Sequence, residues 1–137
     1  MANATMQYLA DQVLNWVKGT SFAAAPSNLY IALLTTNPTT NTGTSQVECS
    51  DSGYARIAIA SSGWSAVSQN ADTIHDQISN SAAVTFGAAV ASYTVTGIAV
   101  YDASTSGHEL WAQPVTSQAV AIGNQYQLAA GACVIEI

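Results

Sequence analysis

The stretch YTVTGIAVY-DASTSG-HELWAQPV, residues 93–115, decides the fold. Residues 93–101 are rich in the β-branched and aromatic residues that favour strands, and a second such segment runs from Glu109 to Val115. The residues between them, Asp102 to Gly107, are mostly small and polar and predict a hairpin loop. Pro114 has no backbone N–H, so the returning strand should end there or lie at a sheet edge. The stretch therefore predicts an antiparallel hairpin.

Short strand-like segments continue on both sides of this hairpin. Turn residues separate them, including Gly123-Asn124 on the C-terminal side. Segments of this length and spacing predict a mainly β chain, either an antiparallel β-sandwich or a small, jelly-roll-like barrel. The further expected strands are Leu29–Leu34, Tyr54–Ile59, a short one at Trp64, Ala83–Phe86, Ala119–Ile122 and two around Gly131.

Residues 1–19 form the one expected helix. Apolar side chains from Tyr8 to Val17 recur at helical spacing, and Thr5 or Asn3 could cap the start. Lys18 falls in the last turn, where a cation complements the helix dipole, and Gly19 can end the helix. Residues 36–52 are rich in Thr, Asn, Ser and Gly and predict a long polar loop. Since no boundary between domains is visible, residues 1–137 are expected to form a single β-rich domain.

The chain is poor in charge. It has two basic residues, Lys18 and Arg56, only 7% charged residues and a net charge of −6. No basic stripe can form, so we expect no nucleic-acid partner, and the same shortage of cations weakens binding to anionic lipid. The N-terminus does not resemble a signal peptide, and no apolar run is long enough for a membrane span. A surface of this kind suits a protein packed against other protein.

Candidate chemistry is sparse. Asp72, His75 and Asp76 would share one face of a helical turn and could hold a metal there, or they belong to a polar loop. His108 is expected to be an ordinary surface-loop histidine, and the sequence contains no G-x-S-x-G or phosphate-binding glycine motif. Cys49 and Cys133 are expected to be unpaired thiols. We therefore expect no enzyme activity, no metal and no cofactor.

Two groups of residues are candidates for structural or binding roles. Arg56, expected in the middle of a strand beside Tyr54, predicts a structural salt bridge, with an anionic-ligand site as the alternative. Four aromatic residues either line a saccharide-binding surface or belong to the core and an oligomer interface. They are Trp64, Tyr93, Tyr101 and Trp111.

Several segments, in order along the chain, resemble small tailed-phage virion proteins of the tail fibre, head fibre and capsid decoration type. Residues 29–38, LYIALLTTNP, resemble the family's "LYVALHTADP", and Glu48 followed by GYAR at 53–56 is similar to its next segment. The loop at 62–80 is longer than in the family, and Gly123-Asn124 stands where the family has Gly-Asp. The other similar segments are AVTF at 83–86, VTGIAVYD at 95–102, LWA at 110–112 and AGACVIEI at 130–137.

The resemblance implies a β-rich structural part of the virion, made in the host cytoplasm and without catalysis. The first hypothesis is a capsid decoration (cement) protein that bridges capsomers. Its expected partners are the major capsid protein and copies of itself, with a homotrimer as the expected oligomer. The alternative is a small tail or head fibre subunit that binds a host-surface saccharide.

Overall fold

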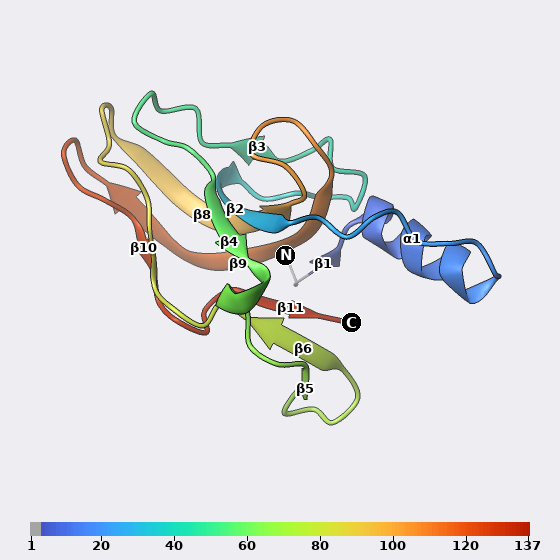
Figure 1. The fold of residues 1–137 in the computed structure, drawn as a ribbon. Helices are drawn as coiled ribbons and strands as arrows, with labels where there is room; N and C mark the ends of the chain where they lie inside the picture. Colours follow the sequence, from blue (N-terminus) through green and yellow to red (C-terminus); the bar gives the residue numbers. More distant parts are fainter. Residues whose placement is uncertain (1–3) are drawn as a thin grey trace.

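The computed structural model describes residues 4–137, which form antiparallel sheets and one helix (Figure 1). The mainly β fold predicted from the sequence is confirmed, and the open sheets are consistent with a β-sandwich. In chain order the elements are β1 (Ala4–Thr5), α1 (Gln7–Val17), β2 (Asn28–Thr36), β3 (Val47–Glu48), β4 (Ile57–Ala60), the 3-10 helix η1 (Ser61–Gly63), β5 (Ser68–Gln69), β6 (Asp76–Ser79), β7 (Val84–Thr85), β8 (Tyr93–Tyr101), β9 (Glu109–Val120), β10 (Gln127–Leu128) and β11 (Val134–Glu136).

The largest sheet is built around the predicted hairpin. Its strand order is β1-β9-β8-β2-β3, and β4 also pairs with β2. The strands β8 and β9 enclose the loop at 102–107, as the sequence predicted, and Ala99 lies opposite Ala112. On the other side of β8, Tyr30 of β2 lies opposite Tyr101. The hairpin and β2 therefore form the centre of the sheet.

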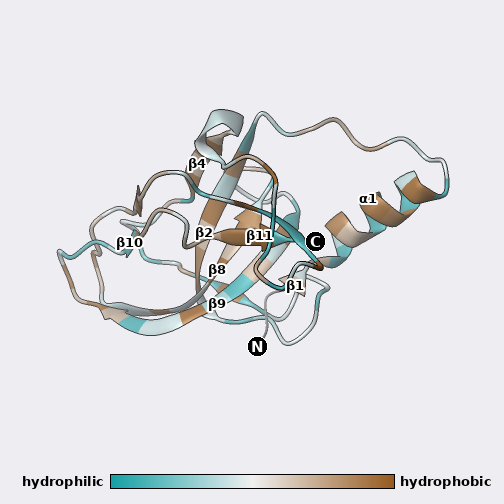
Figure 2. Cartoon of the chain, turned by 90° about the horizontal axis from the view of Figure 1, so that it is seen from below, coloured by the Kyte–Doolittle hydropathy of each residue, from teal (hydrophilic) through white to brown (hydrophobic). Residues whose placement is uncertain are grey.

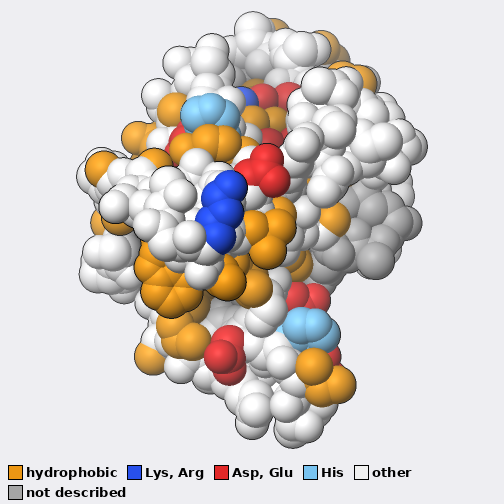
Figure 3. Space-filling model, turned by 90° about the vertical axis from the view of Figure 1, so that its right-hand side faces the viewer, with side chains coloured by type: hydrophobic (Ala, Val, Ile, Leu, Met, Phe, Trp, Pro, Cys, Tyr) orange, Lys and Arg blue, Asp and Glu red, His pale blue; other side chains and the backbone are white. Residues whose placement is uncertain are grey.

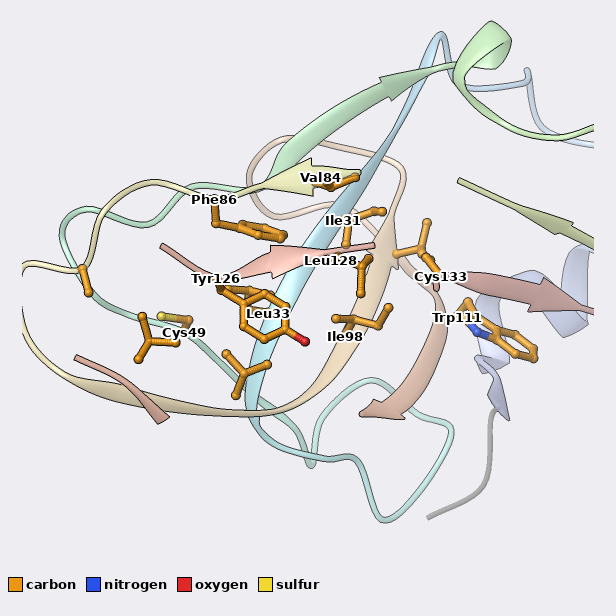
Figure 4. Packing of buried hydrophobic residues seen from close by; sticks show 14 of the residues in the cluster. Ile31, Leu33, Cys49, Val84, Phe86, Ile98, Trp111, Tyr126, Leu128 and Cys133 are labelled. Atoms are coloured by element: carbon orange, nitrogen blue, oxygen red, sulfur yellow. The ribbon is translucent and has the colours of Figure 1, made fainter. Parts of the chain in front are cut away.

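Two small sheets, β10-β7 and β11-β6-β5, complete the core on one face of the large sheet. Figure 4 shows Ile31, Leu33 and Ile98 of the large sheet pointing toward side chains of these segments. The facing side chains are Val84, Phe86, Tyr126, Leu128 and Cys133. Because strand side chains alternate between faces, Ala32, Leu34 and Tyr101 form a smaller cluster on the opposite face of the large sheet.

The N-terminal prediction needs a correction. The helix covers only Gln7–Val17, and Ala4–Thr5 forms a strand that pairs with Trp111 and Ala112 of β9. Thr5 therefore does not cap the helix; Met6 holds the cap position without a side-chain hydrogen bond. Asn3, the other predicted cap, lies outside the described residues. The predicted end is confirmed, since Gly19 has a φ of +98°, a conformation that glycine adopts without strain.

Three other boundaries differ from the prediction. The polar segment 36–52 is not all loop, because β2 ends at Thr36 and β3 lies within the segment. The strand predicted at 54–59 is β4, Ile57–Ala60, so Arg56 precedes the strand instead of lying in its middle. Pro114 does not end β9, but it lies where β9 is an edge strand: β1 pairs only with Trp111 and Ala112. Within residues 4–137 no strand pairs with the outer side of β9 at Pro114, so no partner there requires a backbone N–H, and the strand continues past the proline.

Candidate functional site

Arg56 connects three segments that are distant in the sequence. Its Nε and Nη2 atoms donate hydrogen bonds to the two carboxylate oxygens of Glu48, at 2.9 and 2.8 Å. Its Nη1 donates to the backbone carbonyls of Ala103 and Ser106 in the β8–β9 loop, at 2.9 and 2.7 Å. The guanidinium carbon lies 3.5 Å from the centre of the Tyr101 ring. The ion pair predicted for Arg56 is therefore present, and it also fastens the hairpin loop.

Little of this guanidinium is left for a ligand. An arginine has five N–H donors, and the contacts to Glu48 and to the loop occupy four of them. The Arg56 side chain is 8% exposed, whereas the Glu48 side chain is 27% exposed. The geometry supports the structural role over the anionic-ligand alternative.

Tyr54 is the second residue singled out by the sequence, and it contacts the same carboxylate. Its hydroxyl donates to Oε1 of Glu48 at 2.7 Å and accepts from the N–H of Leu33 in β2 at 3.1 Å. Burial by itself would raise the pKa of Glu48, but the hydrogen bonds from Arg56 and Tyr54 outweigh it and hold that pKa below its usual range. Glu48 therefore stays ionised and ties the segment before β4 to the central strand.

A second carboxyl beside this cluster behaves in the opposite way. Glu109, the first residue of β9, is 6% exposed, and its Oε2 accepts a hydrogen bond from the Gln46 side-chain amide. The other oxygen, Oε1, has no hydrogen-bond partner among the described residues. Burial raises the pKa of Glu109 to about 7, although the Gln46 amide and the charge of Arg56 oppose the shift. The Gln46 amide also donates to the carbonyl of Gly43, so Glu109 anchors the polar loop before β3.

The segment containing Asp72, His75 and Asp76 forms a loop before β6, with Asp76 as the first strand residue. His75 Nδ1 lies 2.6 Å from Asp72 Oδ2, and the Asp72 side chain also accepts from the N–H groups of Ile74 and His75. These hydrogen bonds lower the pKa of Asp72 to about 2, and the one from the N–H of Ile74 has the largest effect. The three residues do not share a helical turn. Among residues 4–137, no group of three or more His, Cys, Asp or Glu side chains is arranged to hold a metal ion.

The four aromatic candidates belong to the core region. Trp111 and Tyr101 are buried, and Trp64 and Tyr93 are half-buried and pack against the main core. Their positions favour the core alternative over a saccharide-binding surface. Both cysteines are buried, free thiols, as predicted, and burial raises the pKa of Cys133 to about 12.

An apolar groove lies beside α1, which projects from the β layers (Figure 1). The groove has a volume of about 550 Å³ and lies between the helix and the returning segment 22–26, with Leu110 and Asp102 also lining it. Gln12 Oε1 accepts from the N–H of Ala23 at 3.2 Å, and the rings of Trp16 and Phe22 stack with their centres 5.9 Å apart. The returning segment therefore covers one side of the helix.

The sequence did not indicate what holds the base of this helix. Tyr8 stacks on His108, with ring centres 3.7 Å apart and planes 5° from parallel. His108 in turn is held by both carboxylate oxygens of Asp102, through its backbone N–H at 2.7 Å and its Nδ1 at 2.9 Å. His108 is thus an anchor between the hairpin and α1. In the sequence, only the loop that begins at Asp102 and ends at Gly107, next to His108, could have suggested this role.

Two comparisons bear on identity. The family model described as podophage GP4 fiber I protein gp80 matches residues 4–136, which include the hairpin, the Arg56 cluster and α1. A comparison with curated proteins gave no match. None of the helices within residues 4–137 has the length and apolar character needed to cross a membrane. The match covers nearly the whole chain and confirms the family type that the sequence segments resembled: the chain belongs to the family of podophage GP4 fiber I protein gp80, a fibre-type family of phage virion structural proteins.

Proposed function

We propose that this chain is a structural subunit of a virion fibre and that it works by binding protein, without catalysis. The single observation that carries the proposal is the family match over residues 4–136 to a fibre protein. The structure supports a role in assembly, because α1 carries large apolar side chains in solvent: Leu14, Trp16 and Val17 are 65%, 58% and 69% exposed. Surfaces of this kind usually mark contacts with other protein.

The second candidate is the capsid decoration role, with the major capsid protein as partner. The low charge favours it: polar but uncharged side chains cost little to desolvate when a subunit is laid over a shell. Both candidates include self-association, and the sequence-based expectation of a homotrimer remains a proposal. Saccharide binding by the fibre has no support from the four aromatic candidates, which pack in the core region.

Deleting the gene from the phage separates the two candidates. Loss of a fibre subunit should slow adsorption to cells and leave heat-induced genome release unchanged, because the shell itself is intact. Loss of a cement protein should lower the temperature of genome release and leave adsorption unchanged, because contacts between capsomers are missing. The copy number per virion is an independent check: hundreds of copies would contradict the fibre role, and a few to a dozen would contradict the capsid role.

A further inference from the structure

The helix α1 has more apolar surface than the rest of the chain covers. Most of its 11 residues are apolar, yet none of the residues of α1, all of which the structure describes, is buried. A helix that is apolar on most sides is normally enclosed by protein. Figure 2 shows hydrophobic residues recurring along α1, outside the two β layers. The helix is therefore incomplete as a packing unit.

Apart from Trp16, which stacks with Phe22 on another side of the helix, the uncovered apolar surface forms one stripe. The stripe consists of Ala10, Val13, Leu14 and Val17, which share one side of the helix because positions 10 and 17 are each three and four residues from 13 and 14. Leu14 and Val17 are the most exposed of them. The other side, with Tyr8, Leu9 and Gln12, lines the groove under the returning segment.

The charges beside this stripe indicate what could cover it. Asp11 and Lys18 are seven residues apart, which puts them on the same side of the helix, about 10.5 Å apart along the axis. Within residues 4–137 neither side chain makes a hydrogen bond or an ion pair. Figure 3, which looks at the end of the molecule that carries α1, shows hydrophobic side chains gathered around one basic and one acidic side chain. The stripe thus has one negative and one positive charge at its rim.

We propose that the stripe binds the same stripe of a second copy, with the two α1 helices antiparallel about a two-fold axis. In this arrangement the axis passes between positions 14 and 15, so that Leu14 packs near its own symmetry mate. Asp11 of each copy then lies beside Lys18 of the other, which gives two equivalent ion pairs. A parallel pair, or a parallel three-helix contact, would instead place Asp11 beside Asp11 and Lys18 beside Lys18.

A second copy fits this stripe better than a lipid surface does. The chain has a net charge of −6 and only one lysine near the stripe, which gives anionic lipid little to attract. The contact area of one short helix is below the roughly 800 Å² per partner of a standard interface. We therefore expect a weak dimer in dilute solution, strengthened in the virion by high local concentration. The inference rests on the proposed self-association, for which it specifies a two-fold pair through α1 in place of the homotrimer, and not on the position of the protein in the virion.

The test measures the dissociation constant of the full chain by sedimentation equilibrium at low salt, from about 10 µM to about 1 mM. Asp11→Lys and Lys18→Asp each place like charges opposite one another, and each should weaken the dimer about tenfold or more. The double variant Asp11→Lys/Lys18→Asp restores opposite charges and should return the dissociation constant to the wild-type range. Mixing the two single variants should give a heterodimer, whereas each alone stays mostly monomeric.

Two controls separate the contact from folding. Lys18→Asp also removes a favourable charge from the end of the helix, but the double variant retains that defect, so its recovery reports the contact alone. Leu14→Ser should abolish the dimer, whereas Ile122→Ser, at a site 70% exposed on a distant turn, should leave it unchanged. Far-ultraviolet circular dichroism of every variant confirms that α1 is present.

Several results would overturn the proposal. A wild-type chain that stays monomeric up to the highest concentration contradicts it. So does a dimer or trimer that the charge variants do not weaken, although that result leaves self-association in place. If the wild-type chain pellets with phosphatidylcholine vesicles, and if this binding reduces the self-association, the stripe would be assigned to lipid. None of these results decides between the fibre and capsid roles, which depend on the deletion phage.

Discussion

Replacing Glu109 by Gln should stabilise the protein at alkaline pH and have little effect at acid pH. Glu109 is almost fully buried, and one of its oxygens has no hydrogen-bond partner among the described residues. Burial raises its pKa to about 7, above the ordinary value of 4.5, so folding favours the protonated carboxyl. Its contribution to stability is complete below about pH 4.5 and is lost as the pH rises through about 7. A glutamine carries no charge and keeps an oxygen that can accept from Gln46.

The size of the effect follows from the pKa. A difference between 4.5 and about 7 corresponds to about 3 kcal/mol, at about 1.4 kcal/mol per pH unit. Part of this loss is already present at pH 5, since the unfolded carboxyl has begun to ionise there. The stability of Glu109→Gln relative to wild type should therefore rise by about 2–3 kcal/mol between pH 5 and pH 8.

Urea titrations of both proteins at pH 5, 6, 7 and 8 provide the assay. Glu48→Gln is the matched control, because the pKa of Glu48 is held below its usual range and its ionised form is the stabilising one. Both the folded and the unfolded protein have this carboxyl almost fully ionised above about pH 5, so the stability of Glu48→Gln relative to wild type should stay nearly constant from pH 5 to pH 8. A Glu109→Gln curve parallel to wild type across this range would refute the reasoning and show that Glu109 is ionised without penalty.

Three further substitutions test the packing, each by the shift of the urea midpoint. Arg56→Ala should lower the free energy of unfolding by about 3 kcal/mol more than Lys18→Ala, because Arg56 is bound to Glu48 and to the hairpin loop. The Lys18 side chain has no partner among the described residues, so equal midpoints would remove Arg56 from a structural role. Asn80→Ala should lower the free energy of unfolding by about 2–4 kcal/mol, because this 1% exposed amide donates to the carbonyls of Ala82 and Ala129 and accepts from the N–H of Cys133. A loss under about 1 kcal/mol would show that water replaces these hydrogen bonds. Gly87→Ala should destabilise the chain more than Gly123→Ala, because a methyl group at 87 would collide with the carbonyl oxygen of Gly53. Position 123 has free space, so Gly123→Ala costs only the strain of its φ of +82°, about 1 kcal/mol; the opposite order would mean that the backbone at 53 yields easily.

The parts of the fold set by local sequence were predictable. The β8–β9 hairpin, the turn at Gly123 and the end of α1 at Gly19 all follow from residue types at adjacent positions. The strand β1 was missed because two residues carry no periodicity. Its pairing is dictated by Trp111 and Ala112, which lie more than 100 residues further along the chain.

The candidate site shows the same division. An ion pair for Arg56 was predictable from the shortage of cations, but its partner Glu48 was not, because the pairing depends on how β3 and β4 both lie beside β2. Asn80 gave no indication of its role, since an asparagine in a polar segment is normally a turn residue. The stacking of Tyr8 on His108 joins two segments that only the completed sheet brings together.

The way the ends of the described chain are fastened has a consequence for synthesis. The strand β1 pairs with β9, and the last strand, β11, pairs with β6 and delivers Cys133 to the side chain of Asn80. The sheet β11-β6-β5, which covers part of the core, cannot be completed until residues 134–136 have left the ribosome. Until then the apolar face of β2 and β8 lacks part of its cover, and apolar surface exposed in this way favours aggregation. The speed at which β11 pairs with β6, more than the final stability of the fold, should therefore set the yield of soluble subunit in the host cell.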